Sequence, residues 1–116
     1  MATTHKILGQ FTAAANVQGN VYTVPSSTST IASSLTITNQ NASNSSFRLG
    51  IVKSGVTPPA NSATAGSNVW LSFDTVLPAN DSITLSMGMT LAAGDFVIAQ
   101  ANTANISFNL FGTEIS

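Results

Sequence analysis

Side chains that could carry catalysis are few in this sequence. His5 is the only histidine, and it stands beside Lys6 near the N-terminus. A general base needs a positioned nucleophile and an orienting partner, and the sequence indicates no Ser-His-Asp order around His5. The acidic residues all fall in expected turns or at strand ends, and they are Asp74, Asp81, Asp95 and Glu114. A glycosidase would need two of them to face each other across a cleft, and nothing in the sequence favours that arrangement. We therefore expect a protein without catalytic residues, not an enzyme.

Metal and cofactor sites find little support in the sequence. The chain contains no cysteine, so it offers neither a thiolate metal site nor a disulfide framework. A calcium site takes about six to eight oxygen ligands, usually with clustered carboxylates, and the spacing of the acidic residues resembles no such loop. Loop carbonyl oxygens are left as the alternative source of ligands. We predict no cofactor and no metal site.

Charged residues are unusually scarce. The 116 residues include three Lys or Arg and four Asp or Glu, whereas about a quarter of the residues are charged in a typical domain. Proteins that hold duplex DNA by its backbone often make about 6–10 phosphate contacts, and only Lys6, Arg48 and Lys53 are cationic here. We therefore expect no nucleic-acid partner. Arg48 and Lys53 flank one expected strand, where we expect a solvated face or a surface ion pair worth at most ~1 kcal/mol.

Hydropathy and charge together limit where the protein acts. No apolar run approaches the ~20 residues that cross a bilayer, and the first residues lack the apolar core of a signal peptide. We expect a soluble protein that is used without export and does not contact a membrane. So few charges cannot guard many strand edges against pairing with other chains. We therefore expect neighbouring copies or partners to cover those edges.

Apolar and polar residues alternate with a period of two along most of the chain, which predicts strands rather than helices. The expected strands cover residues 7–11, 21–24, 31–38, 47–52, 69–73, 82–86, 96–99 and 106–111. They predict an all-β, single-domain protein over residues 1–116, a two-sheet sandwich of about eight antiparallel strands, either jelly-roll or immunoglobulin-like. Residues 1–6 are expected to form an N-terminal arm. Residues 54–67, which include Pro58-Pro59, are expected to form an exposed loop.

The large aromatic residues are candidates for either the core or an interface. Burying one of them removes about 150–250 Å² from water, which favours the core. In a regular strand Trp70 and Phe73 fall on opposite faces, and the pattern does not decide which face points inward. Trp70 is a hypothetical anchor between subunits. Our interface candidates are Tyr22, Trp70, Phe73 and Lys6.

Turn and core motifs along the chain are shared with a known family. They include Leu8-Gly9-Gln10, Val21-Tyr22-Thr23-Val24-Pro25, Asn80-Asp81-Ser82-Ile83-Thr84-Leu85, Gly94-Asp95 and Phe111-Gly112-Thr113-Glu114-Ile115. In these motifs the chain resembles the small all-β virion structural proteins of tailed bacteriophages, notably those of cyanophages. The resemblance extends over nearly the whole length and brings no catalytic residues with it.

The resemblance implies a location in the virion, after assembly in the host cytoplasm. It implies a non-enzymatic capsid decoration, or cement, protein that binds the head lattice and stabilises it. Its partners would be further copies of itself, in a homotrimer, and the major capsid protein or a tail protein. The arm of residues 1–6 or the loop of residues 54–67 is expected to reach onto a neighbour. The alternatives are a tail, baseplate or fibre component, or a host-surface module that binds carbohydrate.

Overall fold

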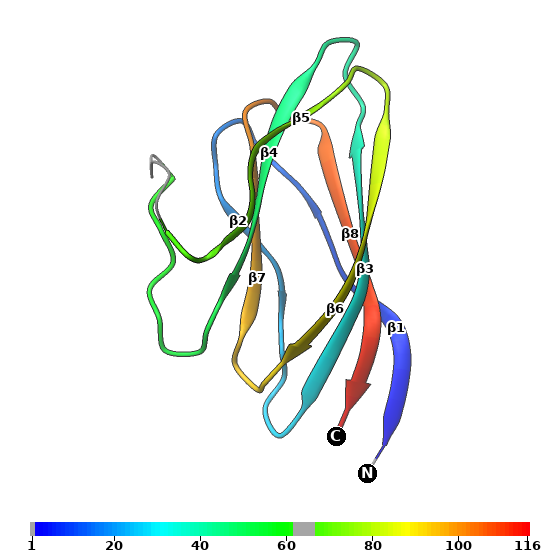
Figure 1. The fold of residues 1–116 in the computed structure, drawn as a ribbon, viewed down its shortest axis with the longest axis vertical. Coiled ribbons are helices and arrows are strands. Elements are labelled where there is room, and N and C mark those ends of the chain that lie inside the picture. Colours follow the sequence, from blue (N-terminus) through cyan, green and yellow to red (C-terminus); the bar gives the residue numbers. More distant parts are fainter. Residues whose placement is uncertain (1, 62–66) are drawn as a thin grey trace.

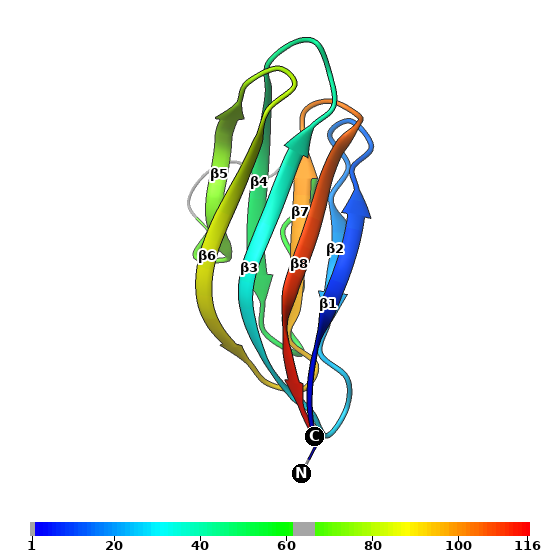
Figure 2. The same ribbon diagram turned by 90° about the vertical axis from the view of Figure 1, so that its right-hand side faces the viewer.

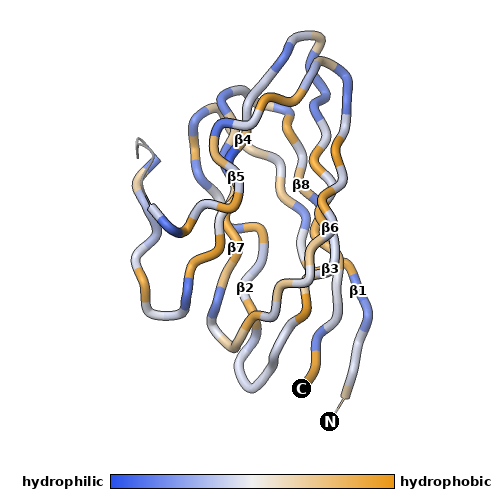
Figure 3. The backbone as a smooth tube through the Cα atoms, in the orientation of Figure 1, coloured by the Kyte–Doolittle hydropathy of each residue, from blue (hydrophilic) through white to orange (hydrophobic). Residues whose placement is uncertain are grey.

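Two packed sheets make up the computed structural model, which describes residues 2–61 and 67–116 (Figure 1). The strands are β1 (Thr3–Thr12), β2 (Gly19–Thr23), β3 (Ser29–Asn39), β4 (Ser45–Val52), β5 (Trp70–Leu77), β6 (Ser82–Leu91), β7 (Phe96–Ala101) and β8 (Ile106–Ile115). All pairings between these strands are antiparallel, and the described residues contain no helix. The predicted all-β sandwich is therefore confirmed. Apolar and polar residues alternate along the strands (Figure 3).

The order of the strands distinguishes the two predicted sandwich types. The first sheet has the order β1-β8-β3-β6 and the second has the order β2-β7-β4-β5. Figure 2 shows the first sheet in front of the second. In an immunoglobulin-like sandwich the first two strands are neighbours in one sheet, whereas here β1 and β2 lie in different sheets. The arrangement is the jelly roll, in which eight strands form two Greek keys.

The core lies between the two sheets. Alternate residues of β8 point into it, and Ile106, Phe108 and Leu110 are all 0% exposed. Phe108 meets Phe47 of β4 edge-on across the sheets, with ring centroids 6.3 Å apart and an interplanar angle of 72°. Phe11 of β1 also packs against Phe108, with ring centroids 6.0 Å apart. These aromatic contacts link β1 and β8 of the first sheet to β4 of the second.

A buried amide holds two turns together at the end of the sandwich away from the chain termini (Figure 1). Asn39, at the end of β3, is 1% exposed. Its Nδ2 donates to the carbonyl oxygens of Ser43, Leu77 and Pro78 at 2.9, 3.1 and 3.1 Å. Its Oδ1 accepts from the backbone N–H of Asn41 at 2.9 Å. This one side chain therefore ties the β3–β4 turn to the β5–β6 turn.

The segment between β4 and β5 covers part of the outer face of the second sheet. Val52 and Ile98 alternate with inward-facing residues, yet they are only 0% and 2% exposed. Gln18 Nε2 donates to the Pro59 carbonyl oxygen and Gln100 Nε2 to that of Asn61, each at 2.9 Å. The described part of the expected loop is therefore held against the sheet, and residues 62–66 lie outside the described residues.

The first strand is longer than the sequence pattern indicated. It begins at Thr3, which pairs with Ile115 of β8. Ala2 N donates to Ser116 O at 2.8 Å, and Ser116 N donates to Ala2 O at 2.9 Å. The residues expected to form an arm thus belong to the sheet from Thr3 onward, while residue 1 lies outside the described residues. The sequence pattern did not indicate this part of the strand, because the outer face of the strand is exposed to solvent and its residues are polar.

We predict that Phe108→Ala lowers the free energy of unfolding by about 3–5 kcal/mol, because it leaves a cavity between the sheets. Phe111→Ala is the matched control, since Phe111 lies on the outer face of the same strand and is only half-buried. We expect the control to cost about 1 kcal/mol or less. Urea denaturation followed by tryptophan fluorescence measures both values. Equal losses in the two variants would contradict this assignment of the core.

Candidate functional site

The structure separates the four interface candidates into two groups. Tyr22 of β2 and Lys6 of β1 lie at one side of the sandwich, where their strands are the edges of the two sheets. Trp70 and Phe73 lie on β5, which is the opposite edge of the second sheet. The four residues therefore do not form one site, and each group is described separately below.

Tyr22 is the centre of a polar cluster near the chain termini. It is 8% exposed. Its hydroxyl donates to Glu114 Oε2 at 2.5 Å and lies 2.8 Å from the Thr30 Oγ1 atom. Lys6 Nζ lies 2.9 Å from Glu114 Oε1, and its side chain is 43% exposed. Because Tyr22 comes from the second sheet and its partners come from the first, the cluster joins the two sheets.

The pKa values in this cluster show a structural arrangement rather than an activated nucleophile. Burial, followed by the hydrogen bond to Glu114, raises the pKa of Tyr22 to about 12. Hydrogen bonds from Tyr22 and then from Lys6 lower the pKa of Glu114 below its usual value. A neutral phenol therefore donates to a carboxylate at neutral pH. The sequence contains a signal for this cluster, because counting by twos along β8 from buried Phe108 leads to Glu114 on the inward face.

Trp70 and Phe73 lie together around Arg48 of β4. The centroids of the two rings are 5.7 Å apart, with an interplanar angle of 60°. Arg48 Cζ lies 4.1 Å from the Phe73 centroid and 5.8 Å from the Trp70 centroid. The prediction that Trp70 and Phe73 fall on opposite faces is wrong. The alternation fails because β5 is irregular: its pairing with β4 shifts in register, and Asp74 has a φ of 52°.

An ion pair joins β4 to β5 beside these rings. Arg48 Nε donates to Asp74 Oδ1 at 2.7 Å, and Arg48 Nη2 donates to Asp74 Oδ2 at 3.3 Å. The predicted surface ion pair is therefore confirmed for Arg48. The guanidinium is largely covered, with 16% of the Arg48 side chain exposed against 51% of the Asp74 side chain. Cation–π contact with Phe73 adds to the same attachment.

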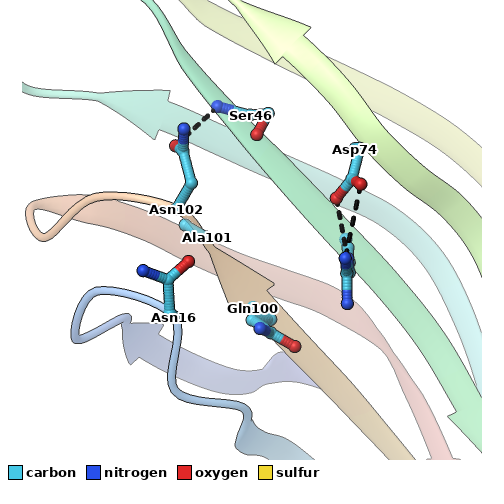
Figure 4. A pocket seen from close by; sticks show the side chains of 7 residues that line it. Asn16, Ser46, Asp74, Gln100, Ala101 and Asn102 are labelled. Atoms are coloured by element: carbon cyan, nitrogen blue, oxygen red, sulfur yellow. Dashed lines mark hydrogen bonds and ion pairs between the residues drawn. The ribbon is translucent and has the colours of Figure 1, made fainter. Parts of the chain in front are cut away.

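A small polar hollow of about 30 Å³ lies next to this ion pair (Figure 4). Its lining residues are Asn16, Ser46, Arg48, Asp74, Gln100, Ala101 and Asn102. Gln100 is 5% exposed, and within the described residues its Oε1 atom has no hydrogen-bond partner. The volume suits about one or two water molecules rather than a sugar or a nucleotide. The hollow also contains one cation and one anion, so it has no net charge to attract an ion.

A wider and more open hollow of about 530 Å³ lies between the end of β6 and the segment after β4. Its lining is mixed, with the apolar residues Ile51, Val56, Val69, Met89 and Leu91 and the polar or charged residues Lys53, Asn68, Thr90 and Asp95. Asp95 at its border accepts from the backbone N–H groups of Ser54 and Ala92, each at 2.9 Å. This carboxylate therefore stabilises local turns.

His5, the one histidine, lies on β1. His5 Nδ1 lies 2.8 Å from Thr113 Oγ1 on an exposed strand. Among the residues that the structure describes, no group of three or more His, Asp or Glu is placed to hold a metal ion. No helix long and apolar enough to cross a membrane occurs in those residues.

Comparison with known proteins identifies a structural similarity without a sequence relationship. No protein-family model matches the chain, and no curated protein is significantly similar to it in sequence. A chain in the structure of infectious bursal disease virus, Gx strain, superposes with a TM-score of 0.56 at 10% identity. The match covers 97% of this chain and 32% of the viral chain, so this chain spans about a third of that protein. At this identity the similarity concerns the fold.

We predict that Glu114 makes stability depend on pH on the acidic side. Because the folded-state pKa of Glu114 lies below its usual value of 4.5, the carboxylate stabilises the fold above that value, and the contribution disappears as the pH falls through the folded-state pKa. Thermal unfolding of the Glu114→Gln variant should therefore show a smaller loss of Tm between about pH 6 and about pH 3 than wild type.

Two further variants separate the effect of the Tyr22–Glu114 hydrogen bond on stability from the general effect of low pH. Tyr22→Phe removes the phenol donor and should also reduce the loss of Tm on the acidic side, with a cost of about 1–3 kcal/mol at neutral pH. Asp81→Asn removes a carboxylate from an exposed turn outside the cluster and is the matched control for the loss of one acidic group. Identical pH profiles for wild type and Glu114→Gln would show that the hydrogen bond does not stabilise the fold.

Proposed function

We propose that the chain is a structural protein of a virus particle, and within that class a capsid decoration protein of a tailed bacteriophage. The main support is the jelly-roll strand order, together with the match over 97% of this chain to part of a chain in a virus structure. Jelly rolls form viral capsid proteins, lectins and cupins, so the fold admits more than one role. The resemblance of the turn and core motifs to phage virion proteins supports the finer assignment.

The outer face of the first sheet supports a role in assembly. Register places hydroxyl and amide side chains side by side across it, among them Thr84, Thr36, Asn109 and Gln10 in one row. Gln10 Nε2 donates to Asn109 Oδ1 at 2.8 Å, and the hydroxyls of Thr36 and Thr84 are 3.1 Å apart. Burying such groups against a partner costs much less than burying charges. A face of this kind suits repeated packing on a lattice.

The candidate interface residues take different parts in this proposal. On β5, which also carries Trp70 and Phe73, Leu71 and Val76 are 52% and 64% exposed. We call the exposed apolar side chains of this strand the β5 patch and propose that they contact the lattice. Tyr22 acts indirectly by holding the sheets together, and the ammonium group of Lys6 borders the opposite side. Each copy need bind only weakly, because contacts to a repeating lattice add through multivalency. Copies associate further as a homo-oligomer, with the trimer as the arrangement that the resemblance implies.

Gold-labelled antibody on intact virions, viewed by electron microscopy, tests the location. We expect label at regular density over the head surface, because a decoration protein follows the capsid lattice. Label confined to the tail or its tip would contradict decoration and would favour a tail, baseplate, fibre or host-binding role. Particles without any label would contradict the virion role. The heat resistance of particles that lack the protein then tests the cement role. We expect these particles to be less resistant to heat than complete particles.

Substitution of exposed valines tests the β5 patch. Val76→Ser should weaken binding of the purified protein to particles that lack it by about fivefold, since it removes apolar area from the contact. Val17→Ser is the matched control, because Val17 is 46% exposed in the loop before β2 and lies outside the patch. Cosedimentation with the particles measures both affinities. Equal binding by the two variants would remove this patch from the interface.

A further inference from the structure

Three of the four sheet edges are protected, and one is not. The edges are β1 and β6 in the first sheet and β2 and β5 in the second. β1 and β2 protect each other, because a Cβ atom on Gly9 would lie 2.0 Å from the Val21 carbonyl oxygen. β5 is interrupted by its register shifts and by Asp74, which lies in the left-handed region and is held by Arg48. Such bulges and charges are the usual protection of an edge.

β6 carries none of these protective features over its first half. Residues 82–91 include no charged residue and no proline. From Ser82 to Ser86 its pairing with β3 is regular, and the only shift in register comes after Ser86. In the described residues no strand pairs with its outer side, where Figure 2 shows it at the rim of the sheet. An exposed row of backbone N–H and C=O groups in this state is a template for another strand.

The side chains of β6, like its backbone, are suited to pairing with a further strand. Ile83, Leu85, Met87 and Met89 face the core but remain only partly buried. Ser82, Thr84 and Ser86 face outward and are exposed. An added strand would cover more of the apolar row and extend the row of hydroxyl groups on the outer face. Residues 82–86 read Ser-Ile-Thr-Leu-Ser, with hydroxyl and apolar side chains placed symmetrically about Thr84. Two antiparallel copies of this segment therefore place side chains of the same type opposite each other.

We propose that two copies of this chain pair β6 against β6, antiparallel, to form one continuous sheet about a two-fold axis at Thr84. In this register Thr84 lies opposite Thr84 of the second copy, Ser82 opposite Ser86, and Ile83 opposite Leu85. Hydroxyl groups thus meet hydroxyl groups, apolar groups meet apolar groups, and no like charges oppose each other. The contact is isologous and closes after two copies. It leaves the outer faces of both sheets free. It goes beyond the proposed function and replaces the trimer, which only the resemblance implies, with a dimer, because each copy has one β6 edge and two such edges close on each other.

Cysteine cross-linking tests the pairing directly, since the chain has no cysteine of its own. Directly opposite residues in an antiparallel pair have Cβ atoms about 4.5–5.5 Å apart, so Thr84→Cys should give a disulfide-linked dimer under mild oxidation. Thr36→Cys is the matched control. Thr36 of β3 pairs with Thr84 of β6. In the dimer the two Thr36 residues would therefore lie three strand spacings apart, ~14 Å, and the two cysteines should not cross-link.

The mass in solution provides the second measurement. Wild type should sediment with the mass of two chains, and Thr84→Lys should raise the dimer dissociation constant by at least about tenfold, because two ammonium groups would face each other. Thr36→Lys should leave the dimer intact. Ser82→Cys and Ser86→Cys, mixed, should form the heterodimer that the register requires.

The opposite results would overturn the proposal. A monomeric wild type without cross-linking at any of the three β6 positions shows that the edge stays free. A trimer in which Thr84→Cys does not cross-link shows that copies join through another surface, because each copy has one β6 edge and three cannot close through it. The virion role would survive either result, since it is tested by the location of label on particles.

Discussion

The contact between Phe47 and Phe108 is the constraint on which the rest of this structure depends. Each ring is almost fully buried, and each comes from a strand that is inside its sheet rather than at an edge. Apolar burial is the dominant favourable term in folding, and it is largest where both layers contribute a large side chain. Once these strands face each other, β3 and β7 follow as their hydrogen-bonded neighbours, and the edge strands are placed at the rims. The surface features proposed for assembly are all properties of those rims and outer faces.

Polar links at the two ends of the sandwich add specificity to this non-directional core. At one end Tyr22 donates to Glu114 across the sheets, and at the other Asn39 donates to three carbonyl oxygens in two turns. A buried polar group is costly unless its hydrogen bonds are made. Each link therefore favours the observed position of the elements that it joins over slightly shifted positions in which its hydrogen bonds would be broken.

The same scarcity of charge connects the fold to the proposed role. A jelly roll leaves four strands at sheet edges, and a typical monomer protects such edges with lysine, glutamate or proline. Here β1 and β2 cover each other, β5 is bulged around Asp74, and within residues 2–61 and 67–116 no strand pairs with the outer side of β6. A charge-poor sheet face, an exposed patch on β5 and an open β6 edge are distinct surfaces. A protein that must contact both its own copies and a lattice needs such separate surfaces.

The sequence by itself determined the strand content, the two-sheet class and the absence of local motifs for chemistry, because the period of two and the turn residues are local properties of the chain. It also indicated that strand edges would lack protection, which follows from composition alone. Only the tertiary structure decided which strands pair, since the jelly-roll order arises from contacts between residues far apart in the chain. It placed Thr3 within a strand through its pairing with Ile115. It brought Trp70 and Phe73 together through a bulge that alternation cannot reveal, and it placed the hydroxyl of Tyr22 within hydrogen-bond distance of a carboxylate from the last strand.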